Sequence, residues 1–417
     1  MWSYTDASPG SHAIHPVHGP ENLGVIRAGA ARQRTIRRRR AVALALLITL
    51  IGAVAIASSQ HGGGSAGSAS RRARQGVLGS RAQRAPGASV RGHIGADAPG
   101  GLRPGSDPSV LPGPVLIADS DNNRLLEVSP DGRVLWRFPA PGDLAPGETF
   151  RVPDDAFFSP NGHQVVVTQE DDFVISVIDL ASHHIVYRYG HPGVPGFQAG
   201  YLNNPDDALL MPSGEIVSGD IKNCRVIVIR PPAHTLLRQL GVTGSCEHQL
   251  GVSYGSPNGA FPMANGDTAI TEINGDWLDV VAPGGRPVLA THPPGFTYPS
   301  DTNEVRPGLF LSADYTSPGA IETFTSHGKL QWRYAPTGAA ALNQPSLAEP
   351  LPNGDVLAND DKNNRVIVID PRTNRIVWQY GHTHVPGAGD GFLSDPDGVD
   401  LAPPYSLAAR FAGMRAP

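Results

Sequence analysis

The chain lacks the short motifs that most often mark an enzyme. It has no paired Cys-x-x-Cys and no phosphate-binding loop, and we expect no Gly-x-Ser-x-Gly nucleophile elbow. After residue 60 its apolar runs are only five or six residues long, rich in Val and Ile, and bounded by Gly, Pro, Asn or Asp. Such runs exclude helical repeats. The two cysteines permit an oxidising location but do not establish one.

A repeated pattern of short strands is present instead. Between Val115 and Tyr380 an apolar strand ending in an acid, a polar turn, a second apolar strand, a turn and a strand ending in an aromatic recur six times. The acids lie 42 to 52 residues apart, at Asp119, Glu170, Asp220, Glu272, Asp314 and Asp360. A period near 50 residues with three or four strands is typical of propeller blades. The sequence predicts an all-β, six-bladed β-propeller.

Proline-led segments mark the inner strand of each blade. They precede every later repeat, at Pro153, Pro205, Pro257, Pro299 and Pro345. The first repeat has no such segment, yet a further one begins at Pro396 after the last repeat. We predict that residues 397–402 supply the inner strand of the first blade and close the ring, which leaves no long unpaired edge. The loop from Gly241 to Tyr254 leaves room for a weak seventh blade.

Two families resemble parts of these repeats. Residues 204–208 (Asn-Pro-Asp-Asp-Ala) and 220–226 (Asp-Ile-Lys-Asn-Cys-Arg-Val) resemble the NHL repeat. Residues 131–136 and 369–378, each ending in Trp, are similar to the Trp-docking repeat of propellers related to the pyrroloquinoline quinone enzymes. The resemblance implies that the Trp packs between blades and that the Arg ties a hairpin turn. Propellers with these repeats include scaffolds, lyases, sulfotransferases and dehydrogenases, so the fold does not decide the function.

An uncharged apolar stretch near the N-terminus predicts a membrane segment. Residues 41–58 follow four arginines at 37–40 and, extended to residue 60, approach the roughly 30 Å needed to cross a bilayer. We predict a signal-anchor helix at 41–60, with residues 1–40 in the cytoplasm by the positive-inside rule and the propeller outside the plasma membrane. The alternative is a signal peptide cleaved after Ala57, which would release a secreted protein.

The remaining boundaries follow from composition. Residues 61–112 consist mainly of Gly, Ser, Ala, Pro and Arg, from which no core can form, so they predict a disordered linker. The propeller is expected at 113–404, followed by a tail at 405–417.

Charge divides sharply between these parts. Residues 1–112 contain 14 Lys or Arg against 4 Asp or Glu, a net charge of +10, whereas the remainder contains 19 against 34, a net charge of −15. An acidic propeller argues against nucleic acid as a partner, because phosphate binding needs a basic surface. It favours cationic ligands or metal ions.

Carboxylates gather where the inner strands begin, which in a propeller converge on one mouth of the central channel. These residues are Asp154, Asp155, Asp206, Asp207, Asp301 and Asp397. Loops on the same face carry His191, His248, His382 and His384. A site of Asp oxygens with one or two imidazoles would suit a divalent metal, either calcium or zinc. The alternative is structural: such Asp residues accept backbone N–H bonds in their own turns, and the loop histidines are solvated.

Two local features stand apart from the repeat. Cys224 lies in the hairpin turn of the third blade and Cys246 in the next interblade loop, on the same face, so a disulfide between them is a candidate and two free thiols are the alternative. Residues 272–277 of the fourth blade lack the Asn-Arg turn found elsewhere, which predicts a local specialisation.

Together these features predict a membrane-tethered, extracytoplasmic binding or scaffolding module. Its acidic face would bind a protein, a glycan or a small ligand. The alternative is a metal-assisted lyase or an arylsulfotransferase-like enzyme that uses the same face. In that case His191, His248 and His382 would act as ligands or acid–base groups, with Asp206 or Asp207 on the metal.

Overall fold

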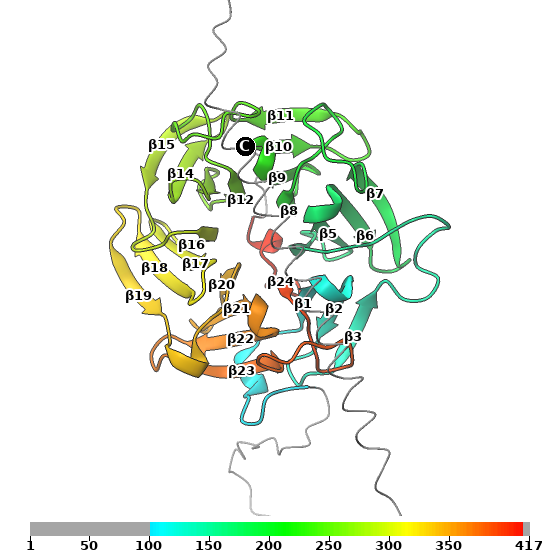
Figure 1. Ribbon diagram of the computed structural model, residues 1–417, viewed down its shortest axis with the longest axis vertical. Helices are drawn as coiled ribbons and strands as arrows, with labels where there is room; N and C mark the ends of the chain where they lie inside the picture. Colours follow the sequence, from blue (N-terminus) through cyan, green and yellow to red (C-terminus); the bar gives the residue numbers. More distant parts are fainter. Residues whose placement is uncertain (1–100, 412–417) are drawn as a thin grey trace, which may run out of the picture. The chain divides into compact units, whose positions relative to one another are not determined.

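The computed structural model describes residues 101–411, and the predicted membrane segment at 41–60 lies outside them. Twenty-four strands form six four-stranded antiparallel sheets arranged around a central channel (Figure 1). The prediction of an all-β, six-bladed propeller is confirmed. The loop from Gly241 to Tyr254 contributes only an isolated bridge between Gln249 and Ser253, so it adds no seventh blade to the part described.

Each blade runs from an inner strand beside the channel to an outer strand. From inside to outside, blade 1 consists of β24 (Pro396–Leu401), β1 (Val115–Asp119), β2 (Arg124–Val128) and β3 (Val134–Phe138). Blade 2 consists of β4 (Ala156–Phe158), β5 (Gln164–Gln169), β6 (Val174–Asp179) and β7 (His184–Gly190). Blade 3 consists of β8 (Pro205–Leu210), β9 (Ile216–Asp220), β10 (Arg225–Ile229) and β11 (Leu236–Leu240). Blade 4 consists of β12 (Pro257–Pro262), β13 (Thr268–Glu272), β14 (Trp277–Ala282) and β15 (Arg286–Thr291). Blade 5 consists of β16 (Pro299–Arg306), β17 (Leu309–Asp314), β18 (Ala320–Thr325) and β19 (Leu330–Tyr334). Blade 6 consists of β20 (Ala348–Pro350), β21 (Val356–Asp360), β22 (Arg365–Asp370) and β23 (Arg375–Gly381).

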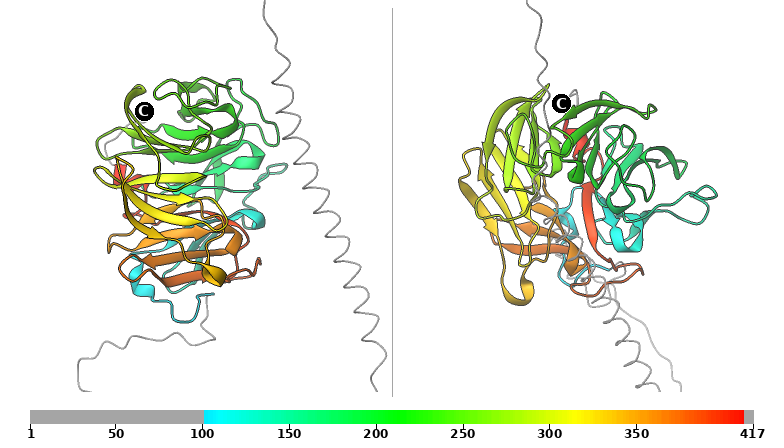
Figure 2. Two further views of the ribbon diagram at one scale, coloured as in Figure 1. Left: turned by 60° about the vertical axis from the view of Figure 1, so that its left-hand side comes forward. Right: turned by 45° about the horizontal axis from the view of Figure 1, so that its top comes forward.

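The C-terminal strand closes the ring as predicted. β24 pairs antiparallel with β1, from Leu401 opposite Val115 to Pro396 opposite Asp119. The red and cyan ends of the propeller sequence therefore lie in one blade (Figures 1 and 2). Because β24 covers β1, β1 is paired on both sides and is not left as an exposed edge where the ring closes.

The acid at the end of the second strand ties each regular blade together. Asp220 illustrates it: one oxygen accepts a bond from Arg225 Nε at 2.7 Å, and the other accepts the backbone N–H of Asn203, just before the inner strand. Asp119 with Arg124 and Asp360 with Arg365 repeat this buried arrangement. The Arg of the NHL-like turn therefore has a structural role.

The second blade departs from the predicted register by one residue. Gln169, not Glu170, lies opposite Val174, as Asp119 lies opposite Arg124 in blade 1. The expectation that Glu170 closes this strand is wrong. Glu170 instead begins the turn that follows and lines the channel.

Short 3-10 turns connect several strands. Those between the second and third strands of a blade are η3 (Ser120–Asn122), η4 (Glu170–Asp172), η5 (Ile221–Asn223) and η7 (Asp361–Asn363). The others are η2 (Pro108–Val110), η6 (Gly338–Ala340) and η8 (Ala408–Phe411). Each of the first four is followed by a residue in the left-handed conformation, which is Asn in two of them, Asn123 and Asn364.

Tryptophans of the outer strands connect neighbouring blades. Trp378 Nε1 donates to the Pro130 carbonyl at 2.8 Å, and Trp332 Nε1 donates to Asn374 Oδ1 at 2.7 Å. In both cases the acceptor lies in the outer hairpin turn of the next blade. The packing between blades that the Trp-docking resemblance implies is therefore present.

Replacing Trp378 with Phe is expected to lower the free energy of unfolding by about 1 kcal/mol. The ring stays buried, but the Pro130 carbonyl loses its donor. Denaturant unfolding measures the change. Trp332→Phe is the matched control, because its hydrogen bond is exposed and a smaller loss is expected. Equal losses in the two variants would contradict this account.

The propeller extends beyond its predicted boundaries at both ends. Residues 101–112 were expected to belong to the linker, but part of this segment lies alongside β23. Leu102 forms a bridge with Tyr380, and the Arg103 N–H donates to the Gln379 carbonyl. In the expected tail, Leu407 is buried and its N–H donates to Asp400. The few apolar residues in these otherwise polar segments dock them. In residues 101–411 no helix has the length and apolarity needed to cross a membrane.

Candidate functional site

The channel site is built from the two residues that follow each inner-strand proline. In blades 1 to 6 the first of these residues is Asp397, Asp154, Asp206, Asn258, Ser300 and Ser346, and the second is Gly398, Asp155, Asp207, Gly259, Asp301 and Leu347. Acids therefore occupy the first position in three consecutive blades, and amide or hydroxyl groups occupy it in the other three. The charge in the channel is concentrated on one side.

These side chains surround a small polar cavity. Its volume is about 70 Å³, enough for a cation with a few waters. The lining residues are Asp154, Asp155, Glu170, Asp206, Ile221, Asn258, Tyr298, Ser300, Asp301, Tyr315, Ser346 and Asp397.

Several of the buried oxygens have no hydrogen-bond donor. Both carboxylate oxygens of Asp207 and one each of Asp155, Asp206 and Asp301 lack a partner. The amide oxygen of Asn258, a residue only 2% exposed, also lacks one. Buried polar atoms are normally paired, so these oxygens either share protons with neighbouring carboxyl groups, as Asp207 does with Asp301, or bind a ligand.

The carboxylates form two groups that share one residue. Asp154, Asp155 and Asp206 offer oxygens within 4.8 Å of one another, and so do Asp155, Asp207 and Asp301. Asp155 therefore lies at the centre of the cluster.

Two glycines have no side chain where the carboxylates of Asp155 and Asp207 lie. A Cβ at Gly398 would lie 2.8 Å from Asp155 Oδ1, and a Cβ at Gly259 would lie 3.0 Å from Asp207 Oδ2. A side chain at position 398 would therefore displace the central carboxylate.

Burial and mutual repulsion raise the pKa values of the cluster. Burial is the larger cause for Asp154 and Asp206, whose pKa values lie well above the ordinary range, and neighbouring carboxylates add to it. Burial also raises the pKa of Asp301 and of Glu170 to about 7. Without a cation, the cluster must therefore retain protons near neutral pH.

The protein itself supplies little compensating charge. Lys362 pairs with Asp395 at the edge of the cluster, and Lys222 acts on Glu170. Among the ion pairs formed within residues 101–411, none includes Asp155, Asp207 or Asp301.

Two tyrosines complete the mouth. Tyr298 precedes Pro299, Tyr315 follows Asp314, and their ring centres lie 5.3 Å apart. Burial, followed by the nearby carboxylates, raises both phenol pKa values above the usual range, so both hydroxyl groups remain protonated donors. Glu170, Tyr298 and Tyr315 were not among the site residues predicted from the sequence. Aligning the residue that follows each strand-closing position would have revealed Glu170 in blade 2 and Tyr315 in blade 5.

The predicted histidines do not join the channel aspartates. His191 contacts the Tyr201 ring and His382 contacts the Phe392 ring, with centres 4.0 and 4.3 Å apart and the rings tilted by 32° and 33°, and both histidines are exposed. His384 lines a separate surface hollow. His248 lies beside two carboxylates of blade 4. The expected mixed site of Asp and His is therefore replaced by an all-oxygen channel, because the long loops direct the imidazoles outward.

Cys224 and Cys246 form a disulfide, with Cα atoms 5.1 Å apart. It joins the β9–β10 turn to the interblade loop that carries His248 two residues later. The bond therefore fixes the start of that loop.

Replacing both cysteines with serine is expected to lower the free energy of unfolding by about 3 kcal/mol. The bond closes a loop of 22 residues, whose freedom in the unfolded chain it limits. Denaturant unfolding with and without reductant measures the effect. Reductant should destabilise the natural chain and leave the double variant unchanged; an equal response in both would contradict the assignment.

Three solved structures resemble the fold of this chain. A protein of unknown function from Bacteroides caccae is 13% identical, with 69% of this chain and 98% of that chain covered and a TM-score of 0.49. A chain of the nidogen/laminin complex is 16% identical, with 69% and 98% covered and a TM-score of 0.47. Streptogramin B lyase is 14% identical, with 70% and 87% covered and a TM-score of 0.46. No protein-family model and no curated protein sequence matches the chain.

Proposed function

We propose that this protein is a membrane-tethered, extracytoplasmic binding module that holds a divalent cation of the calcium class at the mouth of its channel. The cation would in turn recruit an anionic group of a protein, glycan or small ligand. The observation that carries the proposal is the set of buried, unpartnered oxygens around Asp155, which includes the neutral amide oxygen of Asn258. Repulsion among carboxylates alone does not explain an unpaired amide.

The donor set favours calcium over zinc. Calcium takes six to eight oxygen ligands in flexible geometry, whereas zinc prefers nitrogen and sulfur. The cavity offers carboxylate, amide and hydroxyl oxygens from Asp155, Asn258 and Ser300, and no histidine belongs to either carboxylate group.

An anionic ligand group would complete the coordination of the cation. The protonated hydroxyls of Tyr298 and Tyr315 line the same cavity and could donate to that group. Surrounding acids would repel an anion that arrived without the cation. Ligand binding is therefore expected to require calcium.

The proposal places the propeller outside the cytoplasm on a membrane anchor. The apolar stretch at 41–60 after four arginines supports a membrane anchor with the propeller outside the cytoplasm. Extracellular fluids contain calcium at concentrations that suit sites of modest affinity.

The enzymatic alternative has less support. A lyase or sulfotransferase would need an acid–base group beside the bound substrate. His191 and His382 contact aromatic rings of the surface loops, and His248 lies beside carboxylates of blade 4, so none of the three belongs to a channel group.

Calcium binding by the full chain tests the proposal. We expect equilibrium dialysis of protein purified without chelator or immobilised nickel to give about one bound calcium per chain. Asp155→Asn should reduce the affinity at least about 100-fold, because Asp155 belongs to both groups. The control Asp390→Asn removes the same charge from a side chain that is 73% exposed and should bind normally. Absence of calcium binding in the natural chain, or equal binding by Asp155→Asn, would overturn the proposal.

A further inference from the structure

The fourth blade replaces the buried ion pair of the regular blades. Trp277 lies opposite Glu272, in the register where Arg225 lies opposite Asp220. Two residues later, Asp279 occupies the register of the apolar Ile227. The blade has therefore lost a guanidinium and gained a second buried carboxylate.

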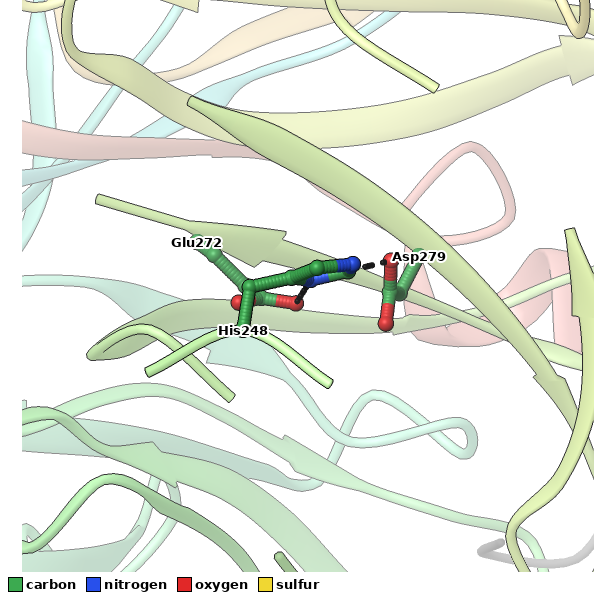
Figure 3. A group of neighbouring side chains, drawn as sticks. All are labelled: His248, Glu272 and Asp279. Atoms are coloured by element: carbon green, nitrogen blue, oxygen red, sulfur yellow. Dashed lines mark hydrogen bonds and ion pairs between the residues drawn. The ribbon is translucent and has the colours of Figure 1, made fainter. Parts of the chain in front are cut away.

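An imidazole from the interblade loop lies between these two carboxylates (Figure 3). His248 Nδ1 is 3.0 Å from Glu272 Oε1 and 3.7 Å from Asp279 Oδ1. The other Glu272 oxygen accepts the backbone N–H of Gly255. Both Asp279 oxygens are fully buried and have no hydrogen-bond donor.

The charge of this cluster is not balanced by the protein. Neither Glu272 nor Asp279 forms an ion pair with an Arg or Lys within the described residues; His248 is the partner of both. A bound divalent cation would supply the missing charge.

We propose that His248, Glu272 and Asp279 form a second metal site, which binds a zinc-class divalent ion through the imidazole Nδ1 and one oxygen from each carboxylate. In a tetrahedral zinc site with bonds of about 2.0–2.1 Å, neighbouring ligand atoms lie roughly 3.3 Å apart. The two observed distances from Nδ1, 3.0 and 3.7 Å, lie on either side of that value. Nitrogen and carboxylate donors together suit zinc better than calcium.

The surroundings hold the imidazole in position. The Trp277 ring stacks on His248 with centres 4.1 Å apart and an interplanar angle of 11°, and His292 covers Trp277 with centres 3.6 Å apart. The Cys224–Cys246 disulfide fixes the start of the loop. Ser253 Oγ donates to the Glu247 carbonyl at 2.7 Å and fixes the residue before His248. Such supporting contacts are typical of preorganised metal ligands.

One side of the site faces solvent. The His248 side chain is 17% exposed, while Glu272 and Asp279 are fully buried. Three protein ligands and an accessible side leave a fourth coordination position for water or for a ligand.

The loop also contains a Gly-x-Ser-x-Gly pattern, Gly-Val-Ser-Tyr-Gly at residues 251–255, which the sequence-based expectation of no such elbow overlooked. Strand β12 rather than a helix follows it, and the buried Ser253 hydroxyl donates to the Glu247 carbonyl rather than to His248. This segment is therefore not a nucleophile elbow.

Zinc titration of the chelator-treated full chain tests the proposal. The natural chain should bind one zinc at this site, and cobalt substituted for zinc should give the visible bands of a four-coordinate ion. Asp279→Asn should weaken zinc binding at least about 10-fold and His248→Gln by a similar factor. Both variants should retain the calcium affinity of the channel, because the two sites share no residue.

The channel variant Asp155→Asn provides the reciprocal control. It should lose calcium and keep zinc, so failure of this inference and failure of the proposed channel function are distinguishable. Thermal unfolding checks that Asp279→Asn and His248→Gln remain folded. Equal zinc binding by Asp279→Asn and the natural chain, or absence of zinc binding in the natural chain, would overturn the inference.

Discussion

In cation-free buffer the propeller is expected to become less stable as the pH rises from about 5 to about 8, and calcium should reverse the loss. Asp301 and Glu170 have pKa values of about 7 in the folded chain, against ordinary values of 3.8 and 4.5. Between about pH 4 and 7 the folded chain therefore binds more protons than the unfolded chain. Its free energy of unfolding falls as the pH rises through that window.

The size of this loss follows from the number of groups involved. A carboxyl group whose pKa rises from about 4 to about 7 on folding contributes roughly 2 kcal/mol between pH 5 and pH 7.5. Burial and neighbouring carboxylates also raise the pKa values of Asp154, Asp206 and Asp207, so these groups add to the loss. A total of several kcal/mol is expected.

With calcium bound, the free energy of unfolding should rise rather than fall with pH in the upper part of this range. It binds the ionised carboxylates, so its affinity rises with pH and its stabilisation grows in the range where the cation-free protein weakens. Thermal unfolding at several pH values, with chelator or with about 1 mM calcium, measures both effects. Stability that is independent of pH, or a calcium effect that is larger at pH 5 than at pH 8, would contradict this account.

The second large effect is expected for Asp207→Asn, which should stabilise the cation-free protein and impair calcium binding. Asp207 is fully buried, both its oxygens lack donors, and Asp301 and Asp155 repel its charge. Removing that charge should raise the free energy of unfolding at about pH 8 by about 2 kcal/mol and lower calcium affinity roughly 100-fold. Asn tolerates the positive φ of 50° at this position.

Denaturant unfolding and calcium titration on the same samples test this prediction. Asp390→Asn, which removes an exposed charge, is the control and should change neither quantity appreciably. Asp207→Asn should also flatten the pH dependence described above. A variant that is less stable and still binds calcium normally would show that Asp207 has a structural role.

The architecture was predictable because each blade repeats the same local chemistry. Apolar runs bounded by turns gave the strands, and the surplus proline segment at Pro396 gave the closure by β24. In blade 2 the predicted register was wrong by one residue. The last position of β5 is occupied by Gln169, which carries no acid, so the neighbouring Glu170 was mistaken for it. The docked residues around Leu102 were missed because a short apolar contact within a polar segment has no periodic signal.

The candidate sites were predictable only in part. The aspartates after Pro153 and Pro205 follow the blade repeat, so their convergence could be inferred from the ring itself. The path of a loop between blades is not encoded by that repeat. The sequence therefore identified His248 and the unusual segment at 272–277 separately, but it did not show that His248 meets Glu272 and Asp279.

Anomalous diffraction from crystals of the propeller grown with calcium would locate the cation itself. We expect an anomalous peak in the channel, about 2.3–2.6 Å from oxygens of Asp155 and its neighbouring aspartates. The peak should be absent from crystals of Asp155→Asn grown in the same solution. A channel that contains only water, with the carboxyl groups bonded to one another through shared protons, would contradict the account.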